Sequence, residues 1–239
     1  MADALFEHRR LAAVYDPLDP DRSDLDAYAA LADELGAASV LDIGCGTGTF
    51  ACLLARRGLE VTGLDPARAS LEVARAKPGA DQVRWIQGEA AALPPLQVDL
   101  VTMTGNVAQV FLTDAGWAAV LRGAWSALRP GGHLVFETRD PQRRAWQAWD
   151  REHAYVRADL DDGWVERWPE VTGVDGPLVS FRSVIRFADG ETLTSTSTLR
   201  FRERAEVEAT LRAAGFTVAG VRDAPDRPGL EFVFVARRS

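Results

Sequence analysis

Short apolar segments alternate with segments of helical spacing between residues 38 and 140. Alternation of this kind predicts βαβ units and a parallel sheet, because each strand is followed by a helix that crosses back over it. Right-handed crossovers place the carboxyl ends of all these strands at one edge, where open α/β sheets bind ligands. The predicted strands are 39–44, 59–65, 82–88, 98–105 and 133–140, and the predicted helices are 49–58, 66–77 and 113–132.

The pattern changes after Asp140, where three segments show period-two alternation instead of helical spacing: 164–174, 177–188 and 191–202. Asp189-Gly190 lies between the last two segments and is a strong hairpin signal. A helix at 203–215 and strands at 216–223 and 230–238 follow. The predicted fold is α/β: a Rossmann-like, doubly wound, mostly parallel seven-stranded sheet with an antiparallel β insertion. The predicted units are an N-terminal helical cap (1–37), the Rossmann-like domain (38–150 and 203–239) and an antiparallel lid (151–202).

Composition narrows the function classes. The 239 residues carry a net charge of -8, which argues against a nucleic-acid partner. The two cysteines, Cys45 and Cys52, cannot build a disulfide framework or a structural zinc site, so no metal is expected. No apolar run reaches the roughly 18 residues that a membrane span needs. We therefore expect a cytoplasmic protein with no membrane partner.

Three glycines, Gly44, Gly46 and Gly48, follow the first strand of the alternating region and precede a helix. A turn of this kind brings a ligand against bare backbone. The dinucleotide fingerprint requires G-x-G-x-x-G, but Thr49 occupies its sixth position. Asp42 precedes the turn, and a carboxylate there would repel a phosphate but suit an ammonium group, directly or through water.

Acidic residues end the next two strands. Asp65 ends the second strand, where an acid accepts hydrogen bonds from both ribose hydroxyls of a nucleoside. Glu89 follows Gly88 at the end of the third strand, where an acid can accept from an adenine amino group while the N–H of Ala90 meets a ring nitrogen. These acids indicate a nucleoside but do not choose between NAD and S-adenosylmethionine.

The motifs VLDIGCGTGTF, VTGLDPA, QGEAAALP, VDLVTMTGNV and LRPGGHLVFE, in this order and spacing, resemble those of class I S-adenosylmethionine-dependent methyltransferases. The resemblance covers about residues 38–140 well and implies S-adenosyl-L-methionine as cofactor and S-adenosyl-L-homocysteine as product. The family more often has aspartate where this sequence has Glu89, and the longer glutamate side chain can still reach the adenine. The expected cofactor-binding residues are Tyr15, Asp42, Gly44, Cys45, Gly46, Gly48, Asp65, Pro66, Gly88, Glu89, Ala90, Thr104 and Gly105.

The acceptor is less constrained. Asn106, Gln109, Phe111 and Arg139 are expected to edge the substrate cavity, since they follow the fourth and fifth strands. Candidates for catalysis are Tyr15, Glu137 and Arg139. The alternatives are that Tyr15 only packs and that Arg139 only pairs with Glu137. Nucleic-acid amino methylases carry an Asn/Asp-Pro-Pro-aromatic motif after the fourth strand, which TGNVAQVF lacks.

The main hypothesis is therefore methyl transfer to an N or O atom of a small molecule by in-line displacement. The insertion resembles the lids of small-molecule N- and O-methyltransferases. Such a sheet can roof the cavity or pair two copies as a homodimer, and both alternatives stay open. A second hypothesis is a cofactor-binding but non-catalytic regulatory or assembly protein, which predicts no open acceptor cavity. An NAD-dependent oxidoreductase is disfavoured by Thr49 and Asp42.

Overall fold

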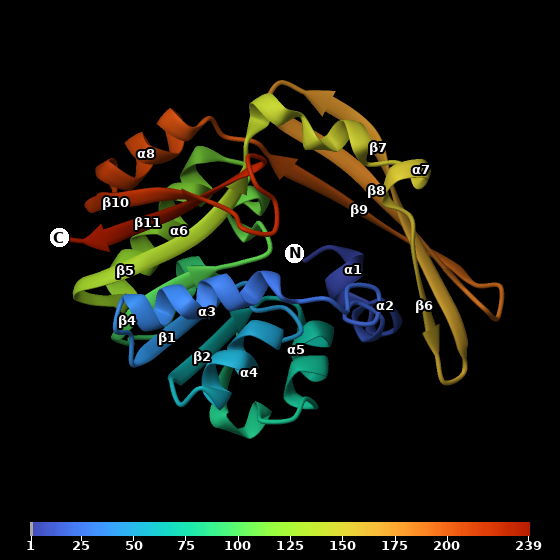
Figure 1. Cartoon of the computed structure of the whole chain (residues 1–239), viewed down its shortest axis with the longest axis horizontal. Coiled ribbons are helices and arrows are strands. Elements are labelled where there is room, and N and C mark those ends of the chain that lie inside the picture. Colours follow the sequence, from blue (N-terminus) through green and yellow to red (C-terminus); the bar gives the residue numbers. More distant parts are fainter. Residues whose placement is uncertain (1) are drawn as a thin grey trace.

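The central sheet has seven strands in the order β3-β2-β1-β4-β5-β11-β10. The computed structural model describes residues 2–239, and Met1, which falls in the predicted N-terminal cap, lies outside the described residues (Figure 1). Strand β11 runs antiparallel to both neighbours, and the other pairs from β3 to β5 are parallel. The strands are β1 Ser39–Ile43, β2 Glu60–Asp65, β3 Val83–Gln87, β4 Val98–Met103, β5 Leu128–Arg139, β10 Phe216–Asp223 and β11 Glu231–Arg238. The predicted fold class is confirmed.

Helices cover both faces of this sheet. Alternate residues of each central strand enter different cores: Leu41 packs on the side of α6 and α8, and Val40 packs on the side of α3 and α4. This explains why the strands read as continuous apolar runs. The α-helices are α1 Ala4–Glu7, α2 Arg9–Ala13, α3 Asp24–Glu34, α4 Thr49–Arg56, α5 Arg68–Arg75, α6 Asp114–Ala127, α7 Arg151–Ala154 and α8 Arg204–Ala213. The short 3-10 helices are η1 Ala80–Gln82, η2 Ala90–Ala92, η3 Val107–Val110, η4 Pro141–Arg143 and η5 Ala145–Ala148.

A second, antiparallel sheet has four strands in the order β6-β7-β8-β9 and extends like an arm beside the central sheet (Figure 1). Its strands are β6 Val156–Leu160, β7 Gly163–Asp175, β8 Leu178–Phe187 and β9 Thr192–Arg200. Three of these strands were predicted, and β6 was not. The predicted hairpin at Asp189-Gly190 joins β8 to β9, and Gly190 has the left-handed φ of +91° that favours glycine there.

The N-terminal segment lies between the two sheets (Figure 1). Leu5, Leu11, Val14 and Leu18 pack against the inner face of the arm and form one apolar core with it. On the opposite side, the Ser70 hydroxyl of α5 donates to the carbonyl oxygen of Phe6, with 2.9 Å between the oxygens. The segment therefore connects the arm to the central domain.

One predicted boundary is wrong. The helix expected over 113–132 ends at Ala127, and β5 begins at Leu128 instead of near His133. Leu128 already pairs with Val98 of β4, and the register then shifts before Leu100 pairs with His133. The Pro-Gly-Gly stretch therefore lies inside the strand as an irregularity, rather than in a turn between helix and strand.

Candidate active site

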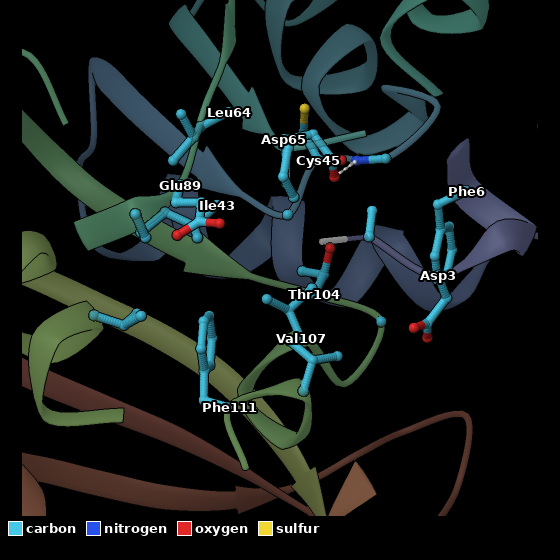
Figure 2. A pocket seen from close by; sticks show the side chains of 18 of the residues that line it. Asp3, Phe6, Ile43, Cys45, Leu64, Asp65, Glu89, Thr104, Val107 and Phe111 are labelled. Carbon is cyan, nitrogen blue, oxygen red and sulfur yellow. Dashed lines mark hydrogen bonds between the residues drawn. The ribbon is translucent and has the colours of Figure 1, made fainter. Parts of the chain in front are cut away.

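A cavity of about 620 Å³ opens at the carboxyl ends of β1, β2 and β4. Figure 2 shows its wall from close by. This is the edge at which the parallel topology predicts a ligand. Most of the predicted cofactor residues contribute to its lining, and so does one predicted substrate residue: Tyr15, Gly44, Cys45, Gly46, Asp65, Pro66, Gly88, Glu89, Ala90, Thr104, Gly105 and Phe111.

The glycine turn is fixed by its neighbours. The backbone N–H groups of Gly44 and Cys45 both donate to the carbonyl oxygen of Leu64, at 2.8 and 3.1 Å. A Cβ on Gly44 would lie 2.5 Å from a methyl group of Val107, so only glycine fits there. A Cβ on Gly46 would meet nothing within 4 Å. The backbone at Gly46 thus faces open space inside the cavity wall, as a turn that holds a ligand against bare backbone requires.

Asp65 ends β2 beside this turn and is 7% exposed. Its Oδ2 accepts from the Gly46 N–H at 2.9 Å and its Oδ1 from the Ala67 N–H at 2.7 Å. Burial raises the pKa of this carboxyl, although both hydrogen bonds oppose the shift. Each carboxylate oxygen retains acceptor capacity, and Asp65 lines the cavity, so hydroxyl groups of a ligand have an acceptor here.

Two ends of the cavity differ in character. Glu89 and Phe111 lie on one side of Thr104, and Asp3 and Phe6 lie on the other (Figure 2). Glu89 is exposed and makes no side-chain bond to the following 3-10 helix, so its carboxylate is free to accept from a ligand. We describe the first side as the nucleoside end and the second as the acceptor end.

Two predicted cofactor residues do not line the cavity. Asp42 is 1% exposed, and its Oδ1 accepts from the Thr102 hydroxyl at 2.8 Å. Burial raises its pKa to about 7, despite that hydrogen bond. Gly48 has a left-handed φ of +77°, and a Cβ on it would lie 2.5 Å from Trp85. Asp42 therefore lies behind the turn and outside the cavity lining, and Gly48 is required for packing.

The remaining predicted residues form a buried polar network behind the wall instead of edging the cavity. Glu137 Oε1 accepts from the backbone N–H of Asn106 at 2.5 Å, and Asn106 Nδ2 donates to Glu231 at 3.2 Å. Arg139 donates to Gln109 Oε1 at 3.2 Å. Burial raises the pKa of Glu137 to about 7.

This network determines the shape of the loop after β4. Asn106 has a left-handed φ of +63°, which is uncommon for a residue with a side chain. Its bonds to two buried carboxylates hold that conformation and so place Thr104, Gly105 and Val107 at the cavity. Asn106, Gln109, Glu137 and Arg139 are not among the residues that line the cavity, and their contact with the substrate stays a prediction.

Several lining residues were not predicted. Arg22 follows the N-terminal segment, and its Nε lies 3.1 Å from Asp24 Oδ1. Among the described residues that line the cavity it is the one cation. Asp3 and Phe6 lie at the acceptor end (Figure 2), and Ser197, whose hydroxyl donates to Asp3, lines the same cavity. The period-two pattern of β9 marked an amphipathic strand, but nothing local in the sequence placed Asp3 beside it.

Comparisons with known proteins agree with this geometry. A family described as "Methyltransferase domain" matches residues 40–132. A malonyl-[acyl-carrier protein] O-methyltransferase from Pseudescherichia vulneris is 30% identical over 178 residues, which cover 68% of this chain and 69% of that protein. The chain belongs to the class I S-adenosylmethionine-dependent methyltransferases.

Other relatives match this chain over less of their length. A ubiquinone biosynthesis O-methyltransferase from Proteus mirabilis is 37% identical over 120 residues, or 48% of this chain and 47% of that protein. The match thus spans about half the length of such curated relatives. An amino pentose methyltransferase from Micromonospora echinaspora, solved with S-adenosylmethionine bound, has a TM-score of 0.71 and 26% identity over 95% of each chain. A sugar N-methyltransferase from Streptoalloteichus has a TM-score of 0.78 over 100% of this chain and 96% of its own, and its 22% identity indicates the fold alone.

S-adenosylmethionine is the cofactor of the family, and the cavity of this chain fits it. A Cβ atom on Gly46 or on Gly105 would have nothing within 4 Å. Both glycines therefore leave room for the cofactor against the backbone. Asp65 and Glu89 supply acceptors where ribose and adenine are expected. Among residues 2–239, no group of three or more His, Cys, Asp or Glu side chains could hold a metal ion. No helix in the same range is long and apolar enough to cross a membrane.

Proposed function

We propose that the protein transfers a methyl group from S-adenosylmethionine to an N or O atom of a small-molecule acceptor by in-line displacement. One observation carries the proposal: a single cavity contains the glycine turn and Asp65 and continues to Asp3 and Ser197, beyond the cofactor residues. When bound, S-adenosylmethionine supplies a methyl group that is already activated on a sulfonium. The protein then contributes positioning and exclusion of water.

The residues that we assign to the cofactor are those at the nucleoside end and around the turn. Asp65 holds the ribose hydroxyls, Glu89 and the N–H of Ala90 hold the adenine, and Gly44 to Gly46 lie against the methionyl group. Thr104 and Gly105 flank the methyl group. We assign the methionyl carboxylate to Arg22, because it is the one cation among the described residues that line the cavity.

The names of the relatives support a small-molecule acceptor but leave the atom open. The curated relatives include O-methyltransferases of ubiquinone biosynthesis and of malonyl-[acyl-carrier protein], whereas a structural neighbour methylates an amino pentose. A non-catalytic regulatory role predicts a cavity that ends at the cofactor. The continuation of the cavity to α1 and β9 favours the enzyme over that alternative. A homodimer through the arm stays a prediction.

Calorimetric titration tests the proposal. The wild type and Asp65→Ala are each titrated with S-adenosylhomocysteine, S-adenosylmethionine and NAD. We expect micromolar binding of the two sulfur ligands, at least tenfold weaker in the variant, and no binding of NAD. Binding of NAD alone, or of none of the three, would contradict the proposed function. Release of S-adenosylhomocysteine in an acceptor screen then tests transfer itself.

A further inference from the structure

Asp3 is held in the cavity by a contact between distant parts of the chain. The Ser197 hydroxyl of β9 donates to Asp3 Oδ2, with 2.5 Å between the oxygens. A second contact lies two residues away from the first on each segment: the backbone N–H of Leu5 donates to the Ser195 hydroxyl at 2.8 Å. Both serines are buried. Asp3 occupies the N-cap position of α1, yet its side chain makes no capping bond. The carboxylate is therefore oriented by the arm and not by its own helix.

The charges of the cavity single out Asp3. Among the described residues, the lining contains four charged side chains: Asp3, Arg22, Asp65 and Glu89. Asp65 lies beside the glycine turn, and Glu89 lies at the nucleoside end. Arg22 carries a positive charge instead of a negative one. Asp3 lies across Thr104 from Glu89, at the acceptor end (Figure 2). It is thus the one acid that the cofactor assignment leaves unused.

We propose that the Asp3 carboxylate, oriented by Ser197, binds the amino group of the acceptor, so that the acceptor is an amine. This inference rests on the proposed function and selects nitrogen from its two alternatives. The Ser197 hydroxyl occupies one oxygen, and the other oxygen remains available to accept from an N–H of the acceptor. A neutral alcohol gains less from a carboxylate than an amine, because the hydrogen bond of an ammonium to a carboxylate is charge-assisted.

The carboxylate also has a role in the transfer step. The acceptor amine first loses its extra proton to solvent and becomes a neutral nucleophile. Its nitrogen forms the new bond to the methyl carbon while the carbon–sulfur bond breaks, and the bonding pair returns to sulfur. Positive charge therefore moves from sulfur to nitrogen, and a fixed carboxylate beside that nitrogen stabilises the charge as it develops. The products are the methylated ammonium and the thioether.

Matched amines and alcohols test this inference on the full chain saturated with S-adenosylhomocysteine. The probes are benzylamine and benzyl alcohol, cyclohexylamine and cyclohexanol, and D-glucosamine and D-glucose, with dissociation constants from ligand-observed NMR titration. We expect at least one amine to bind tenfold more tightly than its alcohol. Asp3→Asn should abolish this preference, since an asparagine oxygen still accepts from Ser197 but carries no charge.

Two controls separate the possible failures. Asp33→Asn, which removes an exposed acid of α3 with a side chain 61% exposed, should keep the amine preference. S-adenosylhomocysteine should bind Asp3→Asn within threefold of the wild type. If it does not bind the wild type, the proposed function fails. If it binds but no amine is preferred, or if the preference survives in Asp3→Asn, only the assignment of Asp3 is overturned.

Discussion

The carboxylate of Asp65 accepts a hydrogen bond from the backbone N–H of Gly46, with 2.9 Å between Oδ2 and N. The bond connects the end of β2 to the turn after β1, so one side chain both shapes the cavity wall and lies on it. The second oxygen accepts from the Ala67 N–H, at the start of the next helix. Removal of the charge at Asp65 should therefore affect folding and cofactor binding together.

Asp65→Asn should lower the free energy of unfolding by about 1–3 kcal/mol. Asparagine has one oxygen, so its NH2 group would face the N–H of either Gly46 or Ala67, and that hydrogen bond would be lost. The substitution should also weaken S-adenosylhomocysteine binding at least tenfold. Urea denaturation and calorimetry measure the two effects. Asp33→Asn is the control: its Oδ2 lies 3.5 Å from Arg57 on the surface, and its loss should cost less than about 1 kcal/mol. Unchanged binding in Asp65→Asn would refute the ribose assignment.

Gly46→Ala should separate the cost of a left-handed backbone from the loss of ligand space. Gly46 and Gly36 have φ of +52° and +64°, and a Cβ on either would meet nothing within 4 Å. Alanine at either position should therefore destabilise by about 1–2 kcal/mol. Only Gly46 lies in the cavity wall, so only Gly46→Ala should weaken S-adenosylhomocysteine binding, by at least tenfold. Equal affinities of the two variants would contradict the placement of the ligand against Gly46.

The sequence predicts those parts of the fold and site that depend on local patterns. Asp65 and Thr104 follow directly from the ends of apolar strands, because a parallel sheet brings such ends to one edge. Strand β6 was missed because its five residues, VRADL, alternate between partly buried and exposed and become a strand only by pairing with β7. Its identity is thus set by a neighbour and not by its own pattern.

The differences between the predicted and the observed positions at the site have another cause. Asn106 was expected to face the substrate because it follows β4, but its left-handed φ turns the loop so that it bonds with Glu137 and Glu231. Neither carboxylate is near Asn106 in sequence. Asp3 and Ser197 are likewise 194 positions apart, and only the packing of the N-terminal segment on the arm brings them together. Contacts of this kind leave no local signal.

Asp42→Asn should change how stability depends on pH. Burial raises the pKa of Asp42 to about 7, above an unfolded value of about 3.9. The folded state therefore binds the proton more tightly, and the stability linked to this group is present below about pH 4 and lost as pH rises through 7. The loss is on the order of 4 kcal/mol, since each pKa unit corresponds to about 1.4 kcal/mol. Asparagine cannot lose a proton and still accepts from Thr102, so the variant should be more stable than the wild type at pH 8.

Urea denaturation at pH 5 and pH 8 measures this effect. The advantage of Asp42→Asn over the wild type should be larger at pH 8 than at pH 5. Asp99→Asn provides the opposite sign: burial alone would raise the pKa of Asp99, but hydrogen bonds from Arg129 and Ser39 lower it overall. Because this lowered pKa lies below the unfolded value of about 3.9, the linked stability changes only below about pH 4, so Asp99→Asn should show the same deficit against the wild type at pH 5 and at pH 8. An advantage of Asp42→Asn that does not vary with pH would show that its charge is not the cause.

Glutamine and alanine variants of Glu137 test whether this side chain positions the loop after β4 or acts as a base in the reaction. Glutamine keeps an oxygen that accepts from the Asn106 N–H, whereas alanine leaves that buried N–H without a partner, at a cost of about 1–3 kcal/mol. Because burial raises the pKa of Glu137 to about 7, its charge opposes folding above that pH, and glutamine removes the charge. At pH 8 Glu137→Gln should be at least as stable as the wild type. Glu137→Ala should be less stable than Glu137→Gln, because both variants remove the charge but only alanine leaves the Asn106 N–H without a partner.

The same two variants should differ in cofactor binding, since Asn106 follows Thr104 and Gly105 in the cavity wall. Glu137→Gln should bind S-adenosylhomocysteine within threefold of the wild type, because the loop keeps its shape. Glu137→Ala should bind it at least fivefold more weakly, because a relaxed loop misplaces both residues. If alanine and glutamine bind equally well, Glu137 does not hold the loop. If both lose methyl transfer while their affinity is intact, the carboxylate acts in the reaction itself.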